Sequence, residues 1–256
     1  MKKLIFLLFV AITTLVIVSC DSSDDPVTPT PTGNLYVTST PSGAQIWVGG
    51  TNTGKVTPDT VKSLDEGVYS VTLKLTDYND TTFSISVTEN QTSVVGPIVL
   101  VSNINTSFFG GIPIRIYESF GTSASQPSGI DLSTGTAYGI SSPSSGLVDI
   151  YYYSNASGTS FLVQSAHLHG TLVRRTDFYV GSNPNIYDGV DSPLRGVGSW
   201  ATGIDDTTTT YVFLYDHDGN YSKLRIVAMG GGTPGNPAWL DVQWYYNNTI
   251  LDNRFQ

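Results

Sequence analysis

The chain has 256 residues, a formal net charge of −9 and a charged fraction of only 13%. Such a negative surface repels phosphate backbones, which argues against nucleic-acid binding, and one cysteine cannot build a disulfide framework or a zinc cluster. The 26 glycines and 15 tyrosines favour strands and turns over amphipathic helices, and the length suffices for about two domains with cores of their own.

The first residues have the organisation of a secretion signal. Lys2 and Lys3 precede an apolar run, Leu4–Val18, that is shorter than the ~20 residues that span a bilayer. The run leads into Ile17-Val18-Ser19-Cys20, which resembles the bacterial lipobox. The resemblance implies that residues 1–19 are a lipoprotein signal peptide and that the following cysteine is lipidated. An ordinary signal peptide or a short anchor helix is the alternative.

A lipidated Cys20 implies a place in the bacterial cell envelope. Several acyl chains anchor a protein stably where one does not. The expected location is the outer membrane, facing the periplasm or the surface, although the Asp21 that follows does not decide between the two membranes. Residues 20–33 contain alternating prolines and threonines without apolar periodicity. They are predicted to form a disordered or extended tether.

The next segment has the period-2 pattern of short strands. Apolar residues alternate in Leu35–Ser39 and Ala44–Val48, and again in Val68–Leu75. Further strands are predicted at 82–87 and 94–100. The motif Leu35-x-Val37-x-Ser39-x-Pro41-x-Gly43-Ala44-x-Ile46-x-Val48, followed by Thr57-Pro58, resembles the PEGA domain. The resemblance implies that residues 34–100 form a small, non-catalytic β-sandwich that serves as a spacer or a binding module.

Residues 101–256 are predicted to form a larger all-β domain. Expected strands lie at 112–117, 147–153, 161–166, 170–173, 211–215, 221–227 and 239–246. Asp216–Asn220 carries the Asp-Gly signal of a hairpin turn. The sequence Gly219-x-Tyr221-x-Lys223-Leu224-x-Ile226, after Ile130–Gly135 and Val148–Ile150, resembles the HmuY-like family of bacterial lipoproteins. That resemblance implies an antiparallel all-β domain and surface binding of haem through His or Met ligands.

Two histidines are candidate ligands for haem or for a metal. If the chain is extended at His167 and His169, both imidazoles face the same side. Such a pair is a weak candidate metal site, because no third ligand can be named. Two polar residues on a surface strand are the alternative interpretation.

The other candidate ligand-binding residues are apolar or aromatic. Met229 precedes three glycines and is a candidate soft ligand, with core packing or a place in a loop as the alternative. In the aromatic runs one set of side chains must pack inside, and the other is free to stack on a flat ligand such as a sugar or a porphyrin. The candidates of this kind are Tyr151, Tyr153 and Trp244.

The sequence offers no catalytic constellation. It has no G-x-S-x-G elbow and no H-E-x-x-H, and the carboxylates of Asp149, Asp205 and Asp206 have no evident partners. We therefore expect an anchored, non-catalytic protein that binds a ligand, with haem as the cofactor the resemblance implies. The alternative is a structural envelope protein that binds protein or glycan partners and no small molecule.

Overall fold

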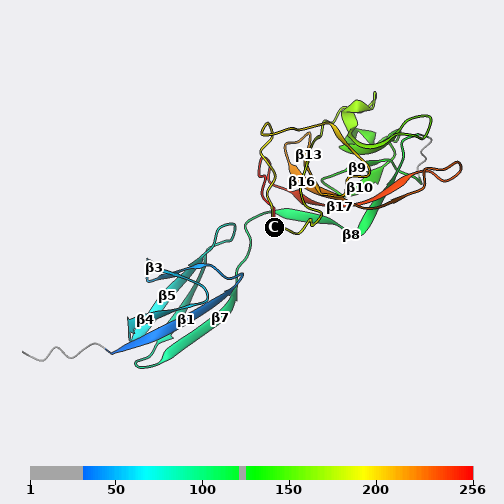
Figure 1. Ribbon diagram of the computed structural model, residues 1–256. Coiled ribbons are helices and arrows are strands. Elements are labelled where there is room, and N and C mark those ends of the chain that lie inside the picture. The colour runs from blue at the N-terminus through cyan, green and yellow to red at the C-terminus, as the bar shows by residue number, and fades with distance from the viewer. Residues whose placement is uncertain (1–30, 121–124, 256) are drawn as a thin grey trace, which may run out of the picture. The chain divides into compact units, whose positions relative to one another are not determined.

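The computed structural model describes residues 31–120 and 125–255 (Figure 1). The signal segment and Cys20 lie outside this range. The described chain consists of strands, turns and two 3-10 helices, and none of its helices is long and apolar enough to cross a membrane. It divides into two compact units. One comprises the described residues up to Lys74 together with Thr81–Val99, and the other comprises Leu75–Asp80 and the chain from Leu100 onward.

The first unit is built from two sheets. The smaller sheet has the order β4-β1-β7 and consists of β1 (Thr32–Thr40), β4 (Asp59–Asp65) and β7 (Thr92–Val99). Strand β7 pairs with β1 in parallel, whereas β4 is antiparallel. The larger sheet has the order β3-β2-β5-β6 and consists of β2 (Gln45–Val48), β3 (Thr51–Val56), β5 (Gly67–Lys74) and β6 (Thr81–Val87).

Alternating side chains of both sheets form the core of the first unit. Leu35, Val37, Ile46, Val71 and Leu73 are completely buried, as their period-2 spacing predicts. Strand β1 begins at Thr32, so it includes the last two residues that we expected in the tether.

The Thr-Pro motif of the first unit has a structural role. The Thr57 hydroxyl is buried, accepts the Ala44 backbone N–H at 3.1 Å and lies 2.6 Å from the Ser39 hydroxyl. This small polar network satisfies donors that would otherwise be buried without partners. It holds the segment after β1 against the segment after β3.

The second unit is a larger sandwich of two five-stranded antiparallel sheets. The first has the order β10-β9-β11-β12-β14 and consists of β9 (Gly129–Asp131), β10 (Thr136–Tyr138), β11 (Ile150–Ser154), β12 (Phe161–Ser165) and β14 (Gly203–Asp205). The second has the order β13-β15-β16-β17-β8 and consists of β8 (Thr106–Tyr117), β13 (Asp177–Val180), β15 (Val212–Tyr215), β16 (Tyr221–Gly230) and β17 (Trp239–Asn247).

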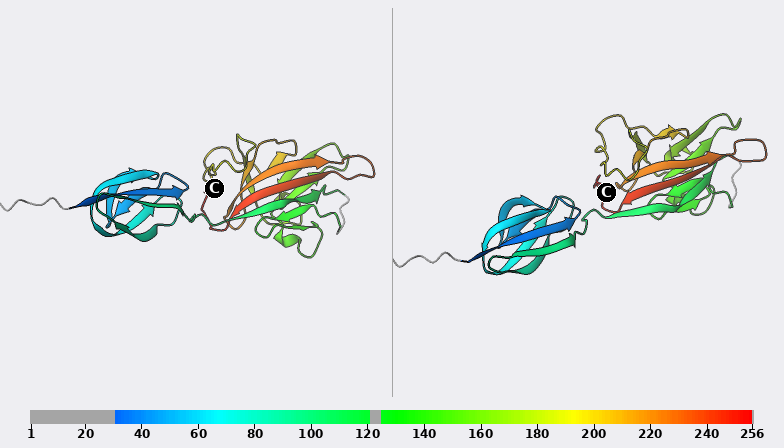
Figure 2. Two further views of the ribbon diagram at one scale, coloured as in Figure 1. Left: turned by 90° about the horizontal axis from the view of Figure 1, so that it is seen from below. Right: turned by 60° about the horizontal axis from the view of Figure 1, so that its bottom comes forward.

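The main core of the second unit lies between these two sheets. Ile150 and Tyr152 from β11 pack in one cluster with Leu224 from β16 and Trp244 from β17. Figure 2 shows β16, β17 and β8 side by side, in agreement with their antiparallel pairing. The expectation of an all-β chain with a sandwich-type fold is confirmed.

The outer faces of both sheets are also covered. A second cluster packs Tyr151 against Val148, Ile140 and Leu172 on the outside of the first sheet. A third cluster lies on the outside of the other sheet and includes Tyr211, Phe213, Tyr221 and Phe255. Each sheet therefore has apolar side chains on both faces, which explains the consecutive aromatic residues of β11 and β17.

Three sequence expectations for the second unit are corrected. No strand forms at 170–173, where Leu172 N–H donates to the His169 carbonyl in a turn. The strand expected from Leu147 starts only at Ile150, because η1 (Ser145–Leu147) precedes it. The apolar run that begins at Phe161 ends in η2 (Ala166–Leu168).

Candidate ligand-binding groove

A groove runs along the loop that joins β16 to β17 and the segments beside it. It consists of three hollows of about 220, 290 and 270 Å³. The first two share Phe161 and Gly232, and the last two share Asp206 and Met229. These shared residues place the hollows side by side, and we call them together the hairpin groove.

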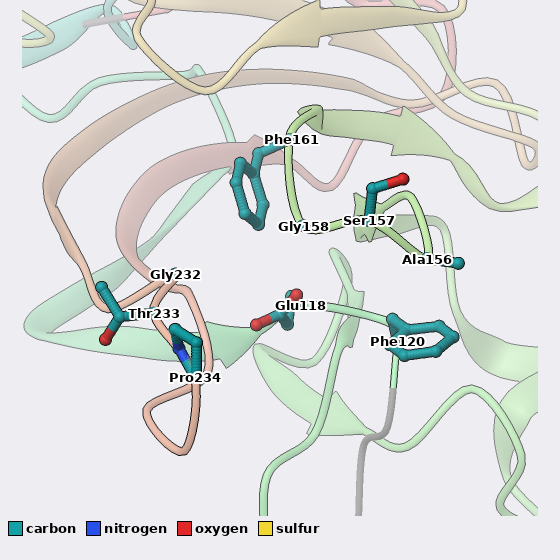
Figure 3. A pocket seen from close by; sticks show the side chains of 9 residues that line it. All are labelled: Glu118, Phe120, Ala156, Ser157, Gly158, Phe161, Gly232, Thr233 and Pro234. Carbon is teal, nitrogen blue, oxygen red and sulfur yellow. The ribbon is translucent and has the colours of Figure 1, made fainter.

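Figure 3 shows the first hollow of the hairpin groove. The Phe161 ring and the Glu118 carboxylate lie on its walls, with Thr233 and Pro234 from the β16–β17 loop opposite the 156–158 turn. Phe120 adds a second aromatic ring and is 61% exposed. Glu118 accepts the Ala238 N–H at 2.7 Å, which ties the loop to the end of β8.

Glycines give the middle of the groove its shape. Gly231 and Gly232 have φ of +72° and +77°, a conformation that residues with a Cβ rarely adopt. A Cβ on Gly231 would lie 2.1 Å from the carbonyl oxygen of Pro237. The loop can therefore fold back closely only with glycine there, and this leaves the space beside Phe161 open.

A partly buried hydrogen bond fixes the polar wall of the groove. Tyr152 donates its hydroxyl to the Asp206 carboxylate at 2.8 Å. Burial raises the pKa of Asp206, and burial together with this hydrogen bond raises the pKa of Tyr152. The Asp206 carboxylate is thus held against the sheet by a neutral phenol.

Met229 is the sequence-predicted residue that the structure places in the groove. Its side chain is 50% exposed and lines two of the three hollows. A side chain with this exposure is not packed in the core, so the core-packing alternative is wrong for Met229. Its thioether is available to a ligand in the groove.

The two candidate histidines, His167 and His169, do not line the hairpin groove. His167 lies in the 3-10 helix η2 and His169 follows directly after it, so the segment is not a continuous strand and the geometry that put both imidazoles on one side does not form. His167 Nδ1 lies 2.6 Å from the Ser165 hydroxyl, and His169 Nδ1 lies 3.1 Å from the Thr171 hydroxyl. In the described part of the chain, no three His, Cys, Asp or Glu side chains are grouped to hold a metal ion.

The aromatic candidates are mostly core residues. Trp244 is completely buried and donates its Nε1–H to the Leu132 carbonyl at 2.9 Å. Tyr151 is 2% exposed and donates its hydroxyl to Gln164 at 2.9 Å. Neither of these rings can stack on a ligand without unpacking a cluster, and Tyr153 lies partly buried against Tyr151. The prediction of an outward aromatic set is therefore wrong for Tyr151 and Trp244.

Asp149 lies in a buried ionic cluster. Its carboxylate accepts the Arg174 Nε–H at 2.7 Å and the Leu132 N–H at 2.9 Å, and Arg174 also pairs with Asp218. Burial raises the pKa of Asp149 to about 7 although Arg174 opposes the shift. Asp216 accepts the N–H groups of Asp218 and Asn220, which closes the predicted hairpin turn.

A second buried ion pair lies under the 181–200 loop. Lys223 is completely buried and pairs with Asp188. Its Nζ also donates to the Val190 carbonyl at 3.1 Å and lies 4.3 Å from the Tyr211 ring centroid. The ammonium thus connects the outer face of β16 to the loop that covers it, and both ion pairs are structural.

Sequence reasoning missed most of the groove. Phe161 and Arg225 lie in runs that also predict ordinary strands, so neither has a signal of its own. Gly230–Gly232 after Met229 was a usable signal, because consecutive glycines often mark a close approach or an open space. Asp206 was noted only as a carboxylate without an evident partner.

Comparison with known families identifies one part of the chain. No curated protein matches it. Residues 32–96 match the PEGA domain family, and they correspond to strands β1 to β7 of the first unit. The PEGA resemblance of the motif around Leu35 and Thr57 is thereby confirmed, and this N-terminal part of the chain is a PEGA domain.

Proposed function

We propose that the protein is a non-catalytic, ligand-binding lipoprotein of the bacterial envelope, in which the second unit binds the ligand in the hairpin groove. The observation that carries this proposal is the row of three adjacent hollows, with shared lining residues, beside β16 and the β16–β17 loop. Ligand sites are typically concave, largely apolar and provided with a few polar groups. The PEGA domain then serves as the module between the membrane anchor and the binding unit.

Haem is the first ligand to test. The resemblance of the second unit to the HmuY-like family implies it, and the exposed thioether of Met229 in the groove is a suitable soft ligand for iron. The Phe161 ring on the same wall offers an apolar surface to a porphyrin plane.

A haemin titration tests this function. The protein from residue 21 onward retains every described residue and avoids the detergent that acyl chains require. We expect a saturable shift of the Soret band, weakened or moved by Met229→Leu and unchanged by His167→Ala/His169→Ala. A titration without saturation would remove haem as the ligand. If the Soret shift were lost only in the histidine variant, the haem site would lie at the histidines and not in the groove.

The lipid anchor has its own test. Metabolic labelling with a radioactive fatty acid should label the full chain. Only detergent should release the labelled protein from membranes. Cys20→Ser should abolish the label and leave the precursor uncleaved, because the thiol is the acyl acceptor in the lipobox. Labelling that persists in Cys20→Ser would contradict the lipoprotein assignment, while a released, unlabelled wild-type chain would indicate an ordinary signal peptide.

A further inference from the structure

Within residues 31–120 and 125–255, Arg225 is the arginine without an acidic partner. The chain carries more acidic than basic residues, 21 against 12, and every other arginine is paired with a carboxylate. These pairs are Arg115–Asp241, Arg174–Asp149, Arg175–Asp177, Arg195–Asp177 and Arg254–Asp252. Because carboxylates are abundant in this chain, a guanidinium that pairs with none of the described ones is available to an acceptor from outside the chain.

The Arg225 guanidinium is also partly withdrawn from water. Its Nε is buried and has no hydrogen-bond partner among the described residues. Other buried atoms without partners are hydroxyls and carboxylate oxygens, so Arg225 is the cation in this group. A buried donor without an acceptor destabilises the fold, so the position of this guanidinium requires an explanation.

Arg225 lies at one end of the hairpin groove. Strand β15 pairs with β16 only as far as Leu224, so the β16 residues that follow have an open edge toward Asp206–Thr209. The hollow at this edge has a volume of about 270 Å³, and Thr209 on its far side is exposed. A ligand group of a few atoms fits beside the guanidinium.

The wall of the groove between Arg225 and Phe161 is mostly apolar. Beyond Arg225 the wall continues through Val227 and Met229 to Phe161. Asp206 is the carboxylate on this path, and its Oδ2 is already occupied by the Tyr152 hydroxyl. The groove therefore has, at one end, a guanidinium without an acidic partner, next to an apolar stretch of wall from Val227 to Phe161.

We propose that Arg225 binds the acidic group of the ligand, and that the ligand is an amphiphile with an apolar body and a carboxylate or phosphate end. This inference rests on the proposed function, because it assigns chemistry to the same groove. Guanidinium groups match carboxylates and phosphates with two parallel hydrogen bonds. The apolar body then lies along Met229 and Phe161.

Calorimetric titration with four matched probes tests the inference. The probes are dodecanoate, dodecyl phosphate, dodecanol and dodecyltrimethylammonium, each below its micelle concentration and with the protein from residue 21 onward. We expect at least one anionic probe to bind about tenfold or more tightly than dodecanol, which is the usual size of a charged hydrogen bond. The comparison of the two anions separates carboxylate from phosphate as the preferred end group.

Two variants assign the preference to Arg225. Arg225→Gln should remove the difference between the anion and dodecanol, and Arg225→Lys should keep part of it. Arg175→Gln is the matched control for charge, because Asp177 keeps its pair with Arg195. An anion preference that survives Arg225→Gln, or equal binding of all four probes, would overturn the inference. Absence of any binding would overturn it too, whereas the haemin titration decides the proposed function separately.

Discussion

Replacing Lys223 with methionine is expected to lower the free energy of unfolding of the second unit by about 3–5 kcal/mol. The substitution leaves the Asp188 carboxylate in a largely buried place without its cation. It also removes the donor to the Val190 carbonyl and the contact with the Tyr211 ring. Breaking a buried pair on one side is costly because the remaining charge loses its compensation.

Urea unfolding followed by near-ultraviolet dichroism measures this loss. Arg175→Gln serves as the control, since its exposed side chain predicts a change under about 1 kcal/mol. The double variant Lys223→Met/Asp188→Leu should recover much of the stability, because paired charges can be replaced by apolar side chains. If Lys223→Met is as stable as the control, the pair does not hold the 181–200 loop in solution.

The sequence predicts the fold of the first unit well where apolar residues alternate. Leu35 and Val37, or Val71 and Leu73, point inward at every second position and are completely buried. The pattern does not reveal β3 and β4. Both consist mostly of polar residues, so they lack the apolar alternation that a buried face imposes.

In the second unit the same reasoning fails for a different reason. It predicts that one face of the aromatic strands meets solvent, but Tyr151 on the outer face of β11 is covered, and Trp244 of β17 packs in the core between the sheets. Tyr151 is buried under the segment that contains Leu172, which we had expected to be a strand. Period-2 patterns show which residues share a face, but they do not show whether a distant loop covers that face.

The groove could be predicted only in part for the same physical reason. Met229 and Asp206 attract notice by residue type, and Gly230–Gly232 by their conformational freedom. Their meeting with Phe161 and Arg225 depends on where β15 ends beside β16, and this register is a tertiary property. An unpaired arginine likewise becomes visible only after the partners of all the others are known.

The ionisation of Asp149 predicts a pH dependence of stability with a definite sign. Burial raises its pKa from an ordinary 3.8 to about 7 in the folded chain. The folded state therefore holds a proton that the unfolded chain has already released between these values. The contribution of Asp149 to the free energy of unfolding is most favourable below about pH 4. It decreases as the pH rises toward 7 and is constant above pH 7.

Comparison of the wild type with Asp149→Asn isolates this contribution. Between pH 4 and 7 the wild type should lose a few kcal/mol relative to the variant, at about 1.4 kcal/mol for each unit of pKa difference. Asp205→Asn is the control, because hydrogen bonds from Thr207 lower the pKa of that exposed carboxyl below 3.8, so its contribution to stability is constant from pH 4 to 7 and is lost only in more acidic solution. A flat difference would mean that Arg174 outweighs burial and keeps Asp149 ionised, and the cluster would then be an ordinary buried ion pair whose stability is lost only in acid.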